Sequence, residues 1–153
     1  MIEMPRAKGA INIAASANVV WDRIIEPERY LVWNTDFTEY TIVDDKEEKV
    51  GTTYYMVGEK GGAPVKIDCI VAEWVENGRF SFRGTSKEGM EAEGTFTIEL
   101  TGEGCTVSLE EDLELPGVKG KIIGALFLKK AKLKNIEAAL QSLKRAIETN
   151  LSA

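Results

Sequence analysis

The feature that most constrains this chain is a run of short alternating segments joined by short turns. Between residues 52 and 115, stretches rich in β-branched and aromatic residues are separated by glycine-containing turns, and Asn77-Gly78 is a two-residue hairpin signal. Strands linked so closely must run antiparallel to their neighbours. One more strand is expected before this run, at residues 36–43. The other five expected strands span residues 52–57, 65–74, 79–84, 91–100 and 105–115. Together they predict a six-stranded antiparallel meander.

Alternation within these strands predicts a sheet with one buried and one wet face. In residues 91–100 (EAEGTFTIEL), the apolar side chains share one parity, and the charged and threonine side chains share the other. The positions expected on the buried side are Ala92, Phe96, Ile98 and Leu100. A single apolar face of this size must be covered by another element.

Helical signals occur at the two ends of the chain. After a strand-like stretch at 9–14, Ser16 is a suitable N-cap for a helix, and Pro27 ends that helix and begins a second short one. From about residue 119 to 149, apolar residues recur at steps of three, four or seven. This long helix is the only element large enough to cover the sheet, so the sequence predicts an α+β fold.

Length and composition bound the possible functions. With 153 residues and 44% hydrophobic content, we expect residues 1–153 to form a single domain. The chain has no histidine, which removes serine–histidine and cysteine–histidine nucleophile pairs and the commonest zinc sites. We therefore expect no metal and no cofactor. A formal charge of -6 argues against nucleic acid as a partner.

The same sequence predicts a cytoplasmic location. No apolar stretch near the N-terminus resembles a signal peptide, and no segment has the length and hydropathy of a membrane span. Cys69 and Cys105 lie within strand-like patterns far apart in sequence, so we interpret both as reduced core thiols. The oligomeric state does not follow from the sequence.

One segment resembles a known superfamily. Residues 11–35 (INIAASANVVWDRIIEPERYLVWNT) are similar to the opening of START-like (SRPBCC) proteins, which include birch-pollen-allergen relatives and polyketide cyclase/dehydrase-like proteins. Gly51-Thr52 and the Leu143-Lys144 and Glu148 positions also fit, and the resemblance covers almost the whole chain. It implies the helix-grip fold: a curved seven-stranded antiparallel sheet, two short helices after strand one, and a long C-terminal helix packed across the sheet with a cavity between.

Small residues on the facing elements allow two interpretations of the interior. Either helix and sheet approach closely around a filled core, or they leave a void lined by apolar atoms. The small residues are Gly124, Ala125, Ala131, Ala138 and Ala139 on the helix and Cys69, Ala92 and Gly94 on the strands. The resemblance implies a void that accepts apolar ligands. The candidate ligand-binding residues are Tyr54, Met56, Cys69, Phe80, Phe82, Ala92, Phe96, Ile98, Leu109, Glu111, Leu126 and Lys129.

Glu111 is the most informative of these candidates. It shares the parity of Val107 and Leu109, so alternation places its carboxylate on the inner face. There it either holds a polar group of a ligand or acts as a general acid or base, the only catalytic candidate in the chain. Alternatively, Glu111 lies near the mouth of the cavity, or a bulge at residues 110–112 turns it out to solvent. Lys129 falls within the helix's apolar stripe, where it either pairs with Glu111 or sends its amine outward.

The function that these features favour is binding or transport of a small hydrophobic or amphipathic ligand, lipid-like or polyketide-like, in the cavity. An enzyme is the less favoured alternative, a cyclase or dehydratase working without histidine or metal. A third interpretation is a protein-interaction or maturation factor, similar to co-chaperones of the same fold.

Charge is distributed unevenly along the chain. Residues 1–116 carry 11 basic and 23 acidic side chains, whereas residues 117–153 carry eight and two. The basic helix either docks electrostatically on the acidic sheet or contacts an anionic ligand or membrane surface. The residues placed for such a contact are Lys129, Lys130, Lys132 and Lys134.

Overall fold

The computed structural model describes residues 6–60, 62–114 and 122–150, with side chains at all of these except 60, 113, 114, 122–128 and 150. The elements are β1 (Arg6–Ile13), α1 (Ala17–Ile25), α2 (Pro27–Trp33), β2 (Phe37–Asp44), β3 (Thr53–Lys60), β4 (Ala63–Val75), β5 (Arg79–Thr85), β6 (Glu91–Thr101), β7 (Gly104–Glu114) and α3 (Ile122–Asn150). The expected last residue of the final strand, Leu115, and the expected start of the long helix at Lys119 lie outside the described residues.

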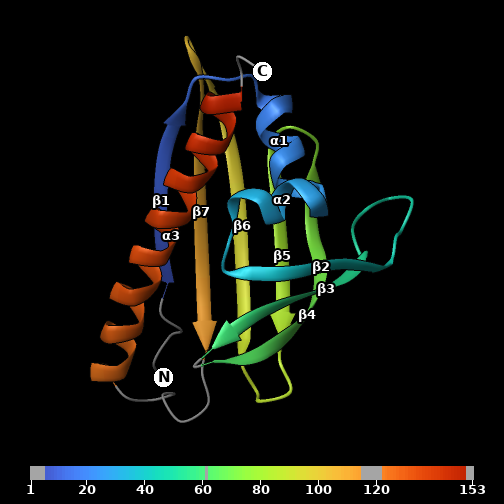
Figure 1. The fold of residues 1–153 in the computed structure, drawn as a ribbon, viewed down its shortest axis with the longest axis vertical. Coiled ribbons are helices and arrows are strands. Elements are labelled where there is room, and N and C mark those ends of the chain that lie inside the picture. Colours follow the sequence, from blue (N-terminus) through green and yellow to red (C-terminus); the bar gives the residue numbers. More distant parts are fainter. Residues whose placement is uncertain (1–5, 61, 115–121, 151–153) are drawn as a thin grey trace.

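The seven strands form one antiparallel sheet in the order β1-β7-β6-β5-β4-β3-β2. Strands β2 to β7 follow one another as the predicted meander, and β1 pairs with β7 at the far edge. The sheet is strongly curved, so that β2 and β3 cross below α2 while β6 and β7 run alongside α3 (Figure 1). Asn77 adopts a left-handed φ of 63° in the β4–β5 turn, but Val75 pairs with Arg79, so the loop has three residues and not the two predicted from Asn77-Gly78. The predicted helix-grip architecture is confirmed.

Helix α3 packs against β1 and β7 and continues along the inner face of the sheet (Figure 1). Its buried residues are Ile136, Leu140, Leu143 and Ile147. Gly9 on β1 allows a close approach, because a Cβ at this position would lie 2.9 Å from Cγ2 of Ile136. Helix α3 therefore packs directly against β1, because Gly9 has no side chain that would keep the helix at a greater distance.

Helices α1 and α2 close the other side of the inner face. Trp21 of α1 meets Trp74 of β4 edge to face at 5.1 Å between ring centroids. Trp33 of α2 is buried, and its Nε1 donates a hydrogen bond to the carbonyl oxygen of Arg23 at 2.8 Å. Both tryptophans hold the short helices to the rest of the core.

The C-terminal turns of α3 are tied to the end of β1. The backbone N–H of Ala14 donates to Glu148 Oε2 at 3.0 Å, and Lys144 Nζ lies 3.1 Å from the same oxygen. Lys144 also donates to the carbonyl oxygen of Asn12 at 2.6 Å. The hydrogen bond from Ala14, with that from Lys144, lowers the pKa of Glu148 below its usual range. This cluster fixes where the helix crosses the sheet.

Three further expectations are resolved by the structure. Leu100 was expected to face the core but is 79% exposed, because it lies beside the β6–β7 turn, beyond the part of the sheet that the helices cover. Cys69 and Cys105 are both free and buried. Among the described helices, none combines the length and the apolar composition needed to cross a membrane.

Candidate functional site

A cavity of about 170 Å³ lies between the curved sheet and the helices α2 and α3. These two helices and the strands β2 to β7 all contribute to it. Its walls are Tyr30, Asn34, Asp36, Phe37, Met56, Ile67, Cys69, Phe82, Met90, Ala92, Phe96, Leu109, Glu111, Lys132, Asn135 and Ala139. The lining is mostly apolar, with polar groups from α2 and its following turn, from β7 and from α3.

Two glycines shape the sheet side of this cavity. The ring of Phe82 occupies the space that a side chain at Gly94 would need, with its Cε1 2.6 Å from an ideal Cβ position. Gly84 makes similar room, because a Cβ there would lie 2.8 Å from Cγ2 of Ile67. The side chains of Phe82 and Ile67 therefore lie against the sheet and do not extend into the interior.

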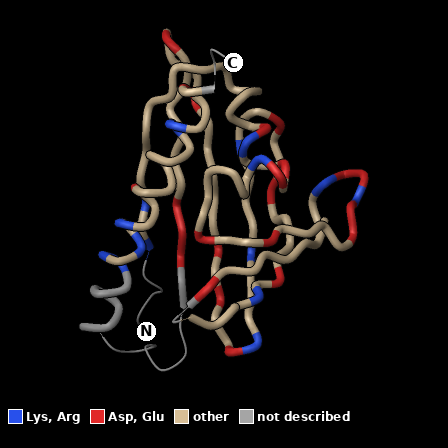
Figure 2. Tube along the Cα trace, in the orientation of Figure 1, with Lys and Arg blue, Asp and Glu red and all other residues tan. Residues whose placement is uncertain are grey.

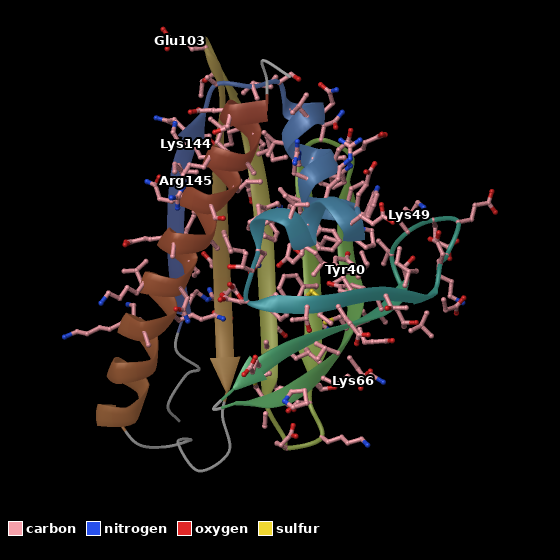
Figure 3. The ribbon with its side chains drawn as sticks, viewed as in Figure 1. Tyr40, Lys49, Lys66, Glu103, Lys144 and Arg145 are labelled. Atoms are coloured by element: carbon pink, nitrogen blue, oxygen red, sulfur yellow. The ribbon has the colours of Figure 1, made fainter. Side chains whose placement is uncertain are left out.

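Three tyrosines stand between α2 and the strands β2 and β3. Tyr40 stacks on Tyr54 at 5.0 Å and meets Tyr30 edge to face at 5.5 Å, which places it between β2 and α2 (Figure 3). The Tyr30 hydroxyl accepts a hydrogen bond from Asn34 Nδ2 at 2.8 Å. Burial, with the nearby charge of Glu111, raises the pKa of Tyr30 far above its usual range. The Tyr30 hydroxyl is therefore neutral, with Asn34 as its partner.

Glu111 and Lys132 form an ion pair in the cavity wall. Lys132 Nζ lies 3.2 Å from Glu111 Oε2, and the side chains are only 21% and 17% exposed. The register of β7 with β1 and β6 is unbroken through residues 110–112, so the alternative of a bulge that turns Glu111 to solvent is wrong. The pair joins α3 to β7 and places one carboxylate and one ammonium beside the apolar space.

The lysine that meets Glu111 is Lys132 and not Lys129. Lys129 lies at the angle of the apolar stripe, as its spacing indicates, but its side chain is exposed. Of the two alternatives for Lys129, the outward-pointing amine agrees with the structure, and the pairing with Glu111 is wrong. The angle at which α3 crosses the sheet turns the face that carries Lys132 toward β7. Spacing along a helix does not contain that angle.

The structure brings together seven of the predicted ligand-binding residues and sets others apart. Those in the cavity wall are Met56, Cys69, Phe82, Ala92, Phe96, Leu109 and Glu111. Tyr54, Phe80 and Ile98 are buried in the adjoining core without lining the cavity. The side chain of Leu126 lies outside the described residues.

Sequence reasoning missed most of the cavity's polar end. Tyr30, Asn34 and Asp36 lie on or just after α2, which the sequence indicated only as a structural helix. Ala139 was recognisable, since it was one of the small helix residues expected to border a void. Lys132 was indicated only as one of four lysines placed for contact with an anionic ligand or surface, and Asn135 carried no signal beyond its helical position.

Cys69 supplies no nucleophile to this cavity. Burial raises the pKa of its thiol to about 12, so the thiolate is not populated near neutral pH. Within the described part of the chain, no group of three or more cysteine, aspartate or glutamate side chains gathers as a metal site would. The chemistry available at the cavity is that of a carboxylate, an ammonium, amides and neutral hydroxyls.

Known proteins share both the sequence pattern and the fold of this chain. The family model described as polyketide cyclase/dehydrase and lipid transport matches residues 4–148. Among curated proteins there is no significant match.

Three solved structures from different kinds of protein share the fold of this chain. Protein TTHA0849 from Thermus thermophilus aligns with a TM-score of 0.74 at 24% identity, covering 96% of this chain and 99% of that one. A START superfamily protein from Mycobacterium smegmatis gives 0.74 at 18% identity, covering 94% and 97%. The di-domain ARO/CYC StfQ from the steffimycin biosynthetic pathway gives 0.79 at 10% identity, covering 99% of this chain and 53% of that one. At these identities the structures show a shared fold.

Proposed function

The chain belongs to the polyketide cyclase/dehydrase and lipid transport family, and we propose that it binds a small, largely apolar ligand carrying a hydroxyl or carbonyl group. The observation that carries this proposal is the cavity between the sheet and the helices α2 and α3, with its apolar walls and its Glu111–Lys132 pair. Burial of ligand surface would supply most of the affinity, and the polar groups would set its orientation.

The size of the cavity limits the ligand. An engineered cavity of about 150 Å³ in another protein binds benzene. The 170 Å³ enclosed by the described residues therefore suits a molecule of one or two rings. A long acyl chain would need additional space.

The polar groups favour a ligand whose oxygen lies beside the Glu111–Lys132 pair, within reach of both side chains. An ionised carboxylate accepts a hydrogen bond from a hydroxyl, and an ammonium donates one to a hydroxyl or carbonyl oxygen. In a site this sheltered from solvent both bonds are stronger than in water. A hydrocarbon without oxygen would gain only the apolar contacts.

We propose 2-naphthol as the test ligand, with naphthalene as the probe that lacks oxygen. Binding of 2-naphthol, followed by its intrinsic fluorescence, should show one site with a Kd on the order of 10–100 μM. Glu111→Gln and Lys132→Met should each weaken 2-naphthol more than naphthalene. Absence of saturable binding for both probes would refute the proposal.

A cyclase or dehydratase is the second candidate, favoured by the same ion pair. Glu111 would take a proton from a carbon next to a carbonyl group, and the electron pair would move onto the carbonyl oxygen beside Lys132. Glu111 would then return that proton to the β-hydroxyl group, which leaves as water while the enolate collapses to a conjugated product. The family's description includes such enzymes, and the arrangement needs neither histidine nor metal.

The two candidates are separated by a turnover assay. The substrate is 4-hydroxy-4-phenylbutan-2-one, whose dehydration forms a conjugated enone that is followed by absorbance. The enzyme candidate predicts a rate above background that Glu111→Gln removes without changing the melting temperature by more than a few degrees. If the protein binds 2-naphthol but gives no rate above background with this substrate, the binding function stands alone.

A further inference from the structure

Three lysines near the start of α3 form a basic patch that the cavity does not use. Lys129, Lys130 and Lys134 are exposed, and none of them forms an ion pair with any residue that the structure describes. Figure 2 shows basic residues on the lower half of α3, whereas acidic residues are spread over the strands, the loops and the short helices. The patch is thus a local positive surface on a chain whose net charge is -6.

The patch is not needed to hold the helix on the sheet. Two other lysines of α3 make the intramolecular ion pairs, Lys132 with Glu111 and Lys144 with Glu148. Because the three lysines of the patch have no such partner among the described residues, electrostatic docking of helix to sheet does not account for them.

Acidic groups near this end of the helix are largely neutralised by other residues. On β7, Glu111 faces α3 and pairs with Lys132, whereas Glu110 and Asp112 point to the other face of the sheet and lie 3.7 Å and 2.9 Å from Arg6. Glu137, on the next turn of α3, is exposed. It reduces the local charge of the patch from +3 to +2 and leaves it positive.

The position of Lys129 shows that the sheet does not shelter this end of the helix. Lys129 falls on the same stripe as Ile136 and Leu140, which are buried, yet it is exposed. The helical backbone continues back to Ile122, and the sequence of residues 122–128, IIGALFL, has no charged residue. A helix in which an apolar segment adjoins lysines is typical of elements that lie at a membrane interface.

From this placement we infer that the basic patch binds the surface of an anionic lipid bilayer, with the turns of α3 that carry these three lysines against the headgroups. Each lysine near such a surface contributes attraction that decays within a Debye length, about 10 Å at 0.1 M salt. The patch is therefore attracted although the whole chain is negative. Lys132, two residues from both Lys130 and Lys134, faces β7 on the other side of the helix, so the patch can dock without engaging the cavity.

The test is co-sedimentation with vesicles of phosphatidylcholine containing roughly 30% phosphatidylglycerol, beside vesicles of phosphatidylcholine alone. The variant Lys129→Glu/Lys130→Glu/Lys134→Glu removes the patch. A matched variant, Lys66→Glu/Lys87→Glu/Arg145→Glu, changes the net charge equally at exposed sites elsewhere. Arg145 is on the same helix but about 16–24 Å further along than the three lysines, beyond a Debye length at 0.1 M salt (Figure 3).

The wild-type chain should bind the anionic vesicles at about 50 mM salt and dissociate at about 500 mM. The patch variant should lose about 100-fold in partition coefficient, and the matched variant less than about fivefold. Equal losses in both variants would show that only net charge matters, and would overturn the inference. So would the absence of binding above the level of neutral vesicles, or retention on heparin without retention on vesicles. None of these outcomes depends on whether the cavity binds a ligand.

Discussion

Filling the cavity from α3 should stabilise the protein and block its ligand at the same time. Ala139 lies in the cavity wall, and its neighbour Ala138 is exposed on the same helix. Ala139→Leu and Ala138→Leu therefore change helix propensity equally but place the added carbons in opposite surroundings. Only the first change should matter to the cavity.

The expected magnitude follows from the three carbons that leucine adds. Each is worth about 0.8 kcal/mol when buried, so the upper limit is about 2.4 kcal/mol. Adjustment of neighbouring side chains removes part of this gain, which leaves about 1–2 kcal/mol. For a chain of this length that is a rise of about 2–8 °C in Tm. A ligand that has to displace the leucine loses the same free energy, so its Kd should rise by about 5–30-fold.

Two measurements check this prediction on the same samples. Thermal unfolding followed by circular dichroism gives Tm, and fluorescence titration with 2-naphthol gives Kd. Ala138→Leu should leave both values within error of the wild type. A fall in Tm for Ala139→Leu would mean that the space is already filled. A higher Tm with unchanged Kd would place the naphthol site elsewhere.

Three further perturbations test other parts of the structure. Lys132→Met should destabilise the fold by about 1–2 kcal/mol in urea unfolding, because it leaves the carboxylate of Glu111 sheltered without a partner. Adding Glu111→Gln to this variant should recover part of the lost stability. Strictly additive effects of the two substitutions would mean that the pair is not coupled. Because the pKa of Glu148 is lowered in the folded protein, its carboxylate contributes stability at pH values above its ordinary pKa, and this stability is lost as pH falls through the lowered pKa. Urea unfolding between about pH 6 and 3 should therefore show a smaller loss of stability for Glu148→Gln than for the wild type. Burial raises the pKa of the Cys69 thiol to about 12, and this contributes stability that is complete below about pH 9 and is lost as pH rises toward 12. The loss at about pH 10.5 should be about 2 kcal/mol. Cys69→Ala should therefore show a shallower decline over that interval, and an identical decline would contradict the burial of the thiol.

The architecture was predictable because its signals are local. Strict alternation in residues 91–100 and the Asn77-Gly78 turn each act over a few residues, and they specify strands and their antiparallel connection without reference to the rest of the chain. The inner facing of Glu111 followed from the same alternation, since a strand without a bulge keeps its period of two.

The errors lie where an element extends past its partner. Leu100 obeys the alternation of β6 but stands beyond the covered part of the sheet, so it is exposed. Lys129 obeys the period of α3 and is exposed. Periodicity predicts the side of an element on which a residue lies, and burial also requires that something lie opposite.

By itself, therefore, the sequence determined the order and type of the elements, the apolar face of the sheet and the presence of a long basic helix. Only the tertiary structure decided that Lys132 meets Glu111, that α2 contributes Tyr30 and Asn34 to the cavity, and that the enclosed space is about 170 Å³. These depend on the curvature of the sheet and the angle at which α3 crosses it. That angle is set by contacts between residues more than a hundred positions apart, such as Ala14 with Glu148 and Gly9 with Ile136. Local periodicity contains no information on such distances, because each side chain's partner is chosen by packing across the whole fold.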